Sequence, residues 1–155
     1  MKHLSSKAVA QFQQAGYLYP VSIITEAEAN RYRASLEAYE QKLGHPVQGP
    51  QRTKPHLLFK WVDDLMRNDG ILDAVEDLIG PDLLCWNTLF WIKEPGSTSF
   101  VSWHQDSQYW GLDTDKLVTV WVALSPSTEK SGCMRVLPGS HTGPCLLYTS
   151  DAADE

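Results

Sequence analysis

A histidine and an aspartate lie two residues apart in the segment SWHQD, residues 102–106, at the end of an apolar stretch. On an extended backbone, residues i and i+2 project from the same face, so His104 and Asp106 could converge on one point, with Gln105 on the opposite face. Imidazole and carboxylate are two of the three protein ligands of the facial triad that holds Fe(II). An HxD pair alone is weak evidence, because chance often produces it and a surface pair or a hydrogen-bonded loop is its commoner meaning.

The first half of the chain carries the signals of helices. Ser5 or Ser6 can cap a first helix that buries an apolar face and ends before Gly16. A capping box from Thr25 to Glu28 begins a second helix, whose apolar positions follow helical spacing until Gly44. These two segments are therefore expected to be surface helices.

The pattern changes from helical to strand-like along the rest of the chain. Residues 45–55, with three prolines and one glycine, indicate a loop, and a third helix is expected near residues 71–79 before Gly80-Pro81. Beyond it, β-branched and aromatic runs predict strands at residues 83–92, 117–124 and 133–137. Helices followed by strands of the antiparallel type predict an α+β domain built on a sandwich or barrel.

The composition indicates a single globular domain outside the membrane. The 155 residues are 43% apolar and 21% charged, and the net charge of -6 with scattered basic residues argues against nucleic acid as a partner. No run reaches the length of a membrane span, and the N-terminus lacks the apolar region of a secretory signal. Three widely spaced cysteines do not form a disulfide framework, which favours the cytoplasm.

Several short motifs, in their order and separation, point to one family. The chain resembles the phytanoyl-CoA dioxygenase family over about residues 5 to 144. The resemblance implies N-terminal helices followed by a double-stranded β-helix, a jelly-roll relative of the cupins that would be incomplete here. The motifs are KPH (54–56), GPD (80–82), KEP (93–95), SWHQD (102–106), LVTVWVALS (117–125) and GCMRVLPGSH (132–141).

The resemblance also implies roles for individual residues. His104 would be the first ligand of Fe(II) and Asp106 its carboxylate ligand, while Lys54 and Trp121 would lie against 2-oxoglutarate, the co-substrate used with O2. A plain exposed lysine is an equally good interpretation of Lys54. His141 is not assigned as the second histidine ligand, because in the family that ligand, followed by an arginine for 2-oxoglutarate, lies further along than this chain extends.

The expected function is hydroxylation of a small-molecule substrate. Related halogenases carry a small residue at the place of Asp106, so a carboxylate there favours hydroxylation. The alternatives are a non-catalytic cupin-like metal- or ligand-binding module and an interaction domain without metal. With two of three ligands, the chain as written is expected to be inactive. The oxygenase domain would cover residues 1–145, and residues 146–155, which resemble a translated cloning adaptor, would be non-native or disordered.

Overall fold

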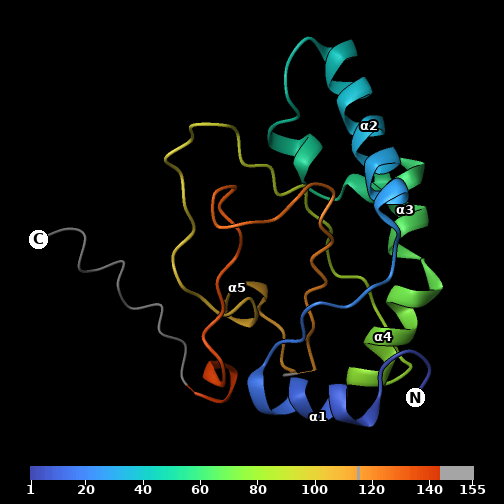
Figure 1. The fold of residues 1–155 in the computed structure, drawn as a ribbon, viewed down its shortest axis with the longest axis vertical. Coiled ribbons are helices and arrows are strands. Elements are labelled where there is room, and N and C mark those ends of the chain that lie inside the picture. Colours follow the sequence, from blue (N-terminus) through green and yellow to red (C-terminus); the bar gives the residue numbers. More distant parts are fainter. Residues whose placement is uncertain (115, 144–155) are drawn as a thin grey trace, which may run out of the picture.

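The computed structural model describes residues 1–114 and 116–143 (Figure 1). Helices α2, α3 and α4 follow one another down one side, and α1 lies across the bottom. The expected tail at 146–155 and the domain end at 145 lie outside these residues. None of the described helices combines the length and apolar character needed to cross a membrane. The helices are α1 (Ser6–Ala15), α2 (Glu26–Leu43), α3 (Lys60–Met66), α4 (Asp69–Ile79) and α5 (Ser107–Trp110), with 3-10 turns η1 (Gly49–Arg52), η2 (Pro55–Leu57) and η3 (Ser140–Thr142).

The first predicted helix is confirmed as α1. The Ser5 side chain accepts a hydrogen bond from the backbone amide of Ala8, the third residue of the helix. Gly16 ends the helix in the left-handed conformation, with φ 81°. Val9 and Phe12, which form the apolar face that the sequence predicts to be buried, are only half-buried. The helix therefore contacts the rest of the molecule through a partly covered apolar face.

Helix α2 follows its sequence signals at both ends. The hydroxyl of Thr25 accepts the N–H of Glu28 at 3.2 Å, and the carboxylate of Glu28 accepts the N–H of Thr25 at 2.8 Å. Gly44, with φ 77°, ends the helix as predicted. Of the four apolar positions at helical spacing, Leu36, Tyr39 and Leu43 pack against the buried core cluster. The fourth, Tyr32, stacks on the ring of Trp61 at 5.6 Å.

The core joins α2, α3 and the segment after α4. Val47, Val62 and Phe90 are buried in one cluster. The ring of Phe90 lies 5.6 Å from that of Trp61 and 5.8 Å from that of Phe59, within the range in which aromatic pairs stabilise a core. The aromatic contacts of Phe90 thus hold together segments 29 and 31 residues apart in the sequence.

The helices between residues 60 and 79 were partly predicted. Helix α4 begins at Asp69, two residues before the expected Ile71, because the Asn68 side chain caps the amides of Gly70 and Ile71 at 2.9 and 3.3 Å. Helix α3 was not predicted. Its seven residues are too few to show a helical period, and its fold depends on the burial of Val62 in the core.

The predicted strand segments are not paired into a sheet among the described residues. In these ranges the only bridge of the sheet type is antiparallel, between Thr53 and Leu89. The amide of Phe90 donates to the carbonyl of Arg52 at 2.9 Å. An apolar, β-branched pattern favours an extended buried chain, but a strand also needs a neighbour for its backbone groups. The α+β class and the incomplete double-stranded β-helix stay predictions.

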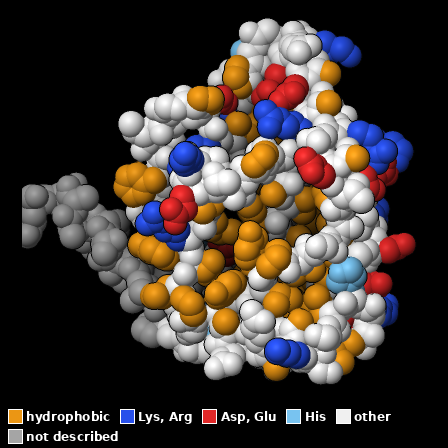
Figure 2. Space-filling model, in the orientation of Figure 1, with side chains coloured by type: hydrophobic (Ala, Val, Ile, Leu, Met, Phe, Trp, Pro, Cys, Tyr) orange, Lys and Arg blue, Asp and Glu red, His pale blue; other side chains and the backbone are white. Residues whose placement is uncertain are grey.

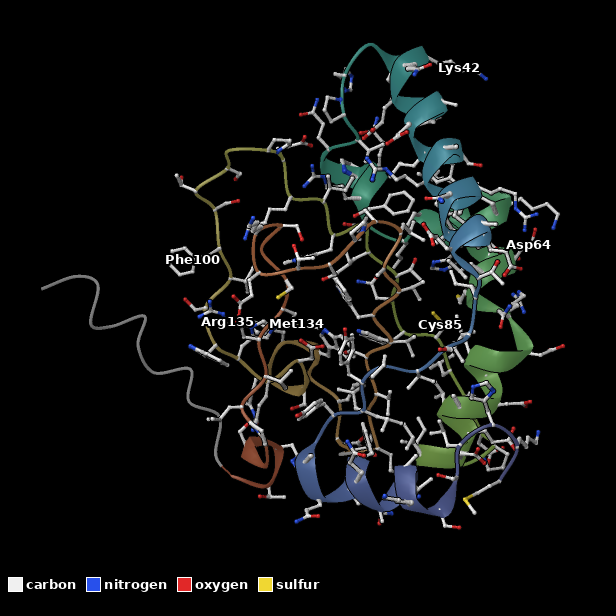
Figure 3. The ribbon with its side chains drawn as sticks, in the orientation of Figure 1. Lys42, Asp64, Cys85, Phe100, Met134 and Arg135 are labelled. Carbon is white, nitrogen blue, oxygen red and sulfur yellow. The ribbon has the colours of Figure 1, made fainter. Side chains whose placement is uncertain are left out.

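Hydrophobic side chains gather across the middle of one face (Figure 2). Of the described residues, six hydrophobic ones are buried and nineteen large ones are exposed, among them Leu84, Phe100, Trp103 and Met134 (Phe100 and Met134 are labelled in Figure 3). Soluble monomers rarely expose a contiguous apolar surface of this kind. Most of the exposed apolar residues between 84 and 137 come from the segments predicted as strands or from the loops beside them.

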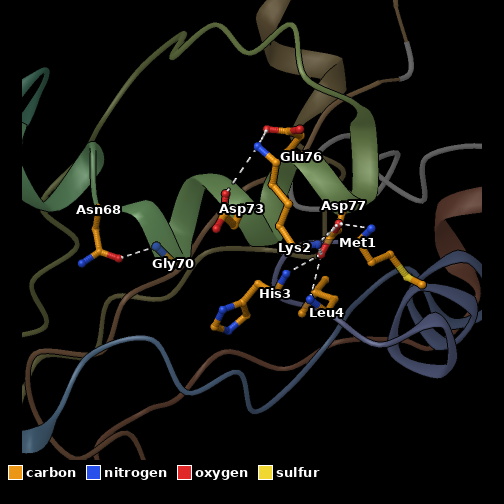
Figure 4. Close-up of polar contacts among 9 residues, drawn as sticks. All are labelled: Met1, Lys2, His3, Leu4, Asn68, Gly70, Asp73, Glu76 and Asp77. Atoms are coloured by element: carbon orange, nitrogen blue, oxygen red, sulfur yellow. Dashed lines mark hydrogen bonds and ion pairs between the residues drawn. The ribbon is translucent and has the colours of Figure 1, made fainter.

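The carboxylate of Asp77 fixes the start of the chain to α4 (Figure 4). It accepts the backbone amides of Lys2, His3 and Leu4 at 2.8 Å each, and its side chain is only 5% exposed. Burial of the carboxyl by itself raises its pKa, but the three amide donors lower it more, so the pKa falls from 3.8 to about 2. The carboxylate also lies near the C-terminal end of α4, where the helix dipole disfavours it, so these donors are required.

Replacing Asp77 with asparagine is expected to lower the melting temperature by several degrees at pH 7. The folded pKa is depressed, so the charged carboxylate stabilises the fold fully above pH 3.8, and this contribution is lost as the pH falls towards 2. Thermal unfolding of both proteins between pH 2 and 7 should show their stabilities converging in that window. Asp82→Asn, at an exposed carboxylate just after α4, is the control. Parallel pH curves for wild type and Asp77→Asn would rule out this role.

Candidate metal centre

The structure brings His104 and Asp106 into direct contact. The Nδ1–H group of His104 donates to the carbonyl oxygen of Ser102 at 2.8 Å, and its Nε2 atom lies 3.1 Å from Oδ1 of Asp106. The two side chains are 29% and 36% exposed, so a ligand can approach from solvent. A hydrogen bond from one ring nitrogen to a backbone carbonyl is how proteins orient a histidine whose other nitrogen binds metal.

The donor atoms of this pair fit a cation. Because Nδ1 donates its proton to Ser102, the Nε2 atom of a neutral His104 ring presents a lone pair to another acceptor, Oδ1 of Asp106. Two acceptors 3.1 Å apart repel unless a proton or a metal ion lies between them. Neighbouring ligands of an octahedral ion bound at about 2.1 Å lie about 3.0 Å apart. The observed spacing therefore suits two adjacent ligands of one ion.

The convergence arises from a turn and not from an extended strand. Asp106 has a helical backbone, with φ -56° and ψ -36°, and is the residue before α5. Its second carboxylate oxygen, Oδ2, accepts a hydrogen bond from the hydroxyl of Thr119. Sequence reasoning missed Thr119. Thr119 is a polar residue inside the otherwise apolar run LVTVWVAL, which could have marked it as functional, but the sequence does not show that it pairs with Asp106.

Gln105 points away from the pair and contacts a distant turn. Its side-chain amide donates to the carbonyl oxygens of Ser140 and Gly143 at 2.9 and 3.2 Å. This turn also contacts α1, because Nε2 of His141 lies 3.0 Å from the carbonyl oxygen of Gln13. These contacts give Gln105 a structural role, on the side opposite to the pair as expected. His141 faces α1, and its ring nitrogen contacts backbone there.

Two helix-ending glycines allow the contact between α1 and the turn to be tested. Gly16 and Gly44 have similar φ values of 81° and 77°, so alanine at either should cost about 1–2 kcal/mol of backbone strain. A Cβ atom at Gly16 would lie 2.4 Å from Nδ1 of His141, whereas one at Gly44 meets nothing within 4 Å. Gly16→Ala should therefore destabilise the chain by about 1–3 kcal/mol more than Gly44→Ala in urea unfolding. Equal losses would mean that the His141 contact does not form.

The predicted co-substrate residues Lys54 and Trp121 lie on two different segments of the chain. Lys54 is exposed and has φ 53° and ψ 44°; of the described residues it alone, apart from glycines, has a positive φ. Such a conformation costs about 1–3 kcal/mol and is typical of functional positions. Its amide donates to Thr88 at 2.8 Å, which fixes the backbone. Trp121 is 44% exposed and follows Thr119 by two residues.

The hollow beside the pair is small. It measures about 30 Å³ and is lined by Trp103, His104, Gln105, Leu137 and Ser140. That volume holds about one water molecule. A larger, open hollow of about 460 Å³ lies at the end of α2, far along the chain from the HxD motif, and presents Glu37, Glu40 and His45. The smaller hollow is lined by His104 of the His104–Asp106 pair, so it is the candidate site.

Comparison with known proteins identifies the family. The model of the family described as phytanoyl-CoA dioxygenase matches residues 12–152. The chain belongs to the phytanoyl-CoA dioxygenase family. This confirms the resemblance drawn from the motifs around His104 and Trp121.

Individual relatives agree with this membership of the phytanoyl-CoA dioxygenase family. The chain is 33% identical over 106 residues to a protein of Stutzerimonas stutzeri named "probable alpha-ketoglutarate-dependent hypophosphite dioxygenase", covering 68% of this chain and 37% of that protein. It is 24% identical to the peroxisomal phytanoyl-CoA dioxygenase of Bos taurus, over 86% of this chain and 46% of that protein. It is 22% identical to the ectoine dioxygenase of Streptomyces avermitilis, over 89% of this chain and 52% of that protein. The chain thus spans about a third to a half of their lengths. No solved structure gave a significant match.

Within residues 1–114 and 116–143, no group of three or more histidine, cysteine, aspartate or glutamate side chains is gathered for a metal ion. The candidate site in this member of the phytanoyl-CoA dioxygenase family therefore consists of His104, Asp106 and the residues that hydrogen-bond to them. Ser102 orients the imidazole and Thr119 orients the carboxylate.

Proposed function

We propose that the protein represented by this chain is an Fe(II)- and 2-oxoglutarate-dependent dioxygenase that hydroxylates a small molecule. The observation that carries the proposal is the convergence of Nε2 of His104 and Oδ1 of Asp106 at 3.1 Å, each side chain held by a second partner. Family membership and relatives named as dioxygenases support the reaction class. Substrate identity is left open, because the named relatives act on chemically unrelated compounds.

His104 and Asp106 would hold the iron on one side. When bound, Fe(II) with 2-oxoglutarate and O2 supplies the oxidising power of the reaction. In a neutral ring, the hydrogen bond from Nδ1 to Ser102 leaves the lone pair of Nε2 for the metal, and the Thr119 hydroxyl leaves Oδ1 of Asp106 directed at the same point. A carboxylate at position 106 occupies a coordination position, which favours hydroxylation over halogenation.

Lys54 and Trp121 would receive 2-oxoglutarate. An ammonium group is a suitable partner for a carboxylate, and an indole face can pack a short methylene chain. Trp121 is two residues after Thr119, which is the spacing of side chains that share one face of an extended chain. Since Thr119 donates to Asp106, that spacing favours a place for Trp121 beside the metal.

The test is an anaerobic titration of the product of the complete reading frame with Fe(II) and 2-oxoglutarate. A weak visible charge-transfer band is expected in the absence of O2, and iron-dependent release of succinate is expected once O2 is admitted. A folded protein that shows neither would overturn the catalytic proposal and leave a non-catalytic cupin-like binding module. The same titration on the 155-residue chain is expected to show a much weaker band, because two protein ligands hold a metal less tightly than three.

The role of Lys54 can be separated from the strain of its backbone. Lys54→Met should weaken 2-oxoglutarate binding by about 10–100-fold, as expected when a hydrogen bond to a charged group is lost. Lys54→Gly should weaken it equally and should also relieve the positive φ of 53°, so it should be the more stable of the two variants. The affinity for 2-oxoglutarate and the melting temperature are measured, with the exposed Lys130→Met as control. Unchanged affinity in both variants would make Lys54 a plain surface lysine.

A further inference from the structure

We propose that Gln105 is a positioning residue, which joins the His104–Asp106 pair to the turn at residues 140–143 and, through it, to α1. The inference rests on the proposed function, since it concerns the geometry of the proposed ligands. Gln105 lies between the two ligands in the chain, so the hydrogen bonds of its side chain restrain the backbone segment that carries both ligands. Its amide spans 35 and 38 residues to reach Ser140 and Gly143.

The polar contacts of the turn form a continuous path. The amide of Gly139 donates to the carbonyl of Ala15 at 2.8 Å, and Nε2 of His141 lies 3.0 Å from the carbonyl of Gln13. Inside the turn, the hydroxyl of Thr142 donates to Gly139 at 2.9 Å. One end of this path is therefore the last turn of α1, and the other is the Gln105 amide.

The direction of each bond makes the bridge specific to an amide. Both partners of the Gln105 side chain are carbonyl oxygens, which accept only, so the side chain must supply two N–H donors. Glutamate has the same shape but presents oxygens and a negative charge to those carbonyls. Methionine has a similar length and no donors. Neither can replace glutamine here, and they fail for different reasons.

The experiment compares Gln105→Glu and Gln105→Met with Gln108→Glu in the 155-residue chain. Gln108 lies on α5 three residues away and is exposed, so its glutamate variant adds the same charge near the pair and leaves the bridge intact. Amide hydrogen exchange at Gly139 and Gly143 is measured first. Exchange is expected to become about tenfold faster in both Gln105 variants and to stay unchanged in the control.

The second measurement follows the ring of His104 without metal. Its imidazole nitrogen signals in NMR spectra report which nitrogen holds the proton. In wild type and Gln108→Glu, Nδ1 should hold it, as the bond to Ser102 requires. In both Gln105 variants the signals are expected to shift or split as the ring loses this fixed orientation. An unchanged His104 spectrum together with faster exchange in the turn would show a purely structural tie, and it would overturn the positioning role.

The third measurement is the affinity of the product of the complete reading frame for Fe(II). Loss of a residue that orients a ligand typically weakens metal binding by 10–100-fold, so at least a tenfold loss is expected in Gln105→Glu and none in Gln108→Glu. If no variant and not even the wild type binds Fe(II), the proposed function fails, while the imidazole spectra still decide whether Gln105 positions His104. If wild type binds and Gln105→Glu binds equally well, the function stands and this inference fails.

Discussion

His104→Ala is expected to abolish iron-dependent turnover and the charge-transfer band in the product of the complete reading frame. The substitution removes Nε2, one of two donor atoms that lie 3.1 Å apart, and leaves Asp106 bonded to Thr119 alone. The loss should exceed the 10–100-fold that follows from removing a residue that only orients a ligand. Succinate release at saturating 2-oxoglutarate and the visible band are the measurements.

A histidine outside the site controls for general effects of the substitution. His3 lies at the start of the chain, where only its backbone amide bonds to Asp77 (Figure 4), so His3→Ala should keep full activity. Circular dichroism of His104→Ala should match wild type, because the side chain is 29% exposed and contributes little to the core. If His104→Ala folds and still releases succinate with iron, His104 is not a ligand.

Phe90→Ala is expected to be the most destabilising of the substitutions considered. Phe90 is 9% exposed and its ring lies 5.6 Å from Trp61 and 5.8 Å from Phe59, so the change opens a cavity in the cluster that joins α2 and α3. Such substitutions cost about 3–5 kcal/mol, a large part of the 5–15 kcal/mol that stabilises a typical domain. Urea unfolding followed by tryptophan fluorescence measures it, since Trp61 is in the cluster.

The matched control uses the same residue type on the surface. Phe100 is 81% exposed on the outer side of a loop (Figure 3), so Phe100→Ala should change the free energy of unfolding by less than about 0.5 kcal/mol. A similar loss in both variants would mean that the apolar face around Phe100 is covered in solution and that the buried cluster is not the main source of stability.

The helix ends were predictable because their causes are local. The Thr25–Glu28 capping box and the glycines after α1 and α2 act within a few residues, so the sequence shows both the donor and the acceptor. Helices α3 and α5 were missed because seven and four residues carry no periodic signal and their helicity depends on neighbours. The strand segments were equally hard to predict, because a strand needs a neighbouring strand to pair with and the hydrophobic pattern of one segment does not show which segment that is.

The sequence alone determined the family and the residue types of the site. It also kept the backbones of His104 and Asp106 close, because only one residue separates them, while the turn that brings their side chains together is a feature of the fold. Tertiary structure decided what holds them. Thr119 reaches Asp106 across 13 residues and Gln105 reaches Ser140 across 35. A hydrogen bond depends on distance and direction between atoms, and the chain path that brings distant groups within 3 Å is set by the packing of the whole domain.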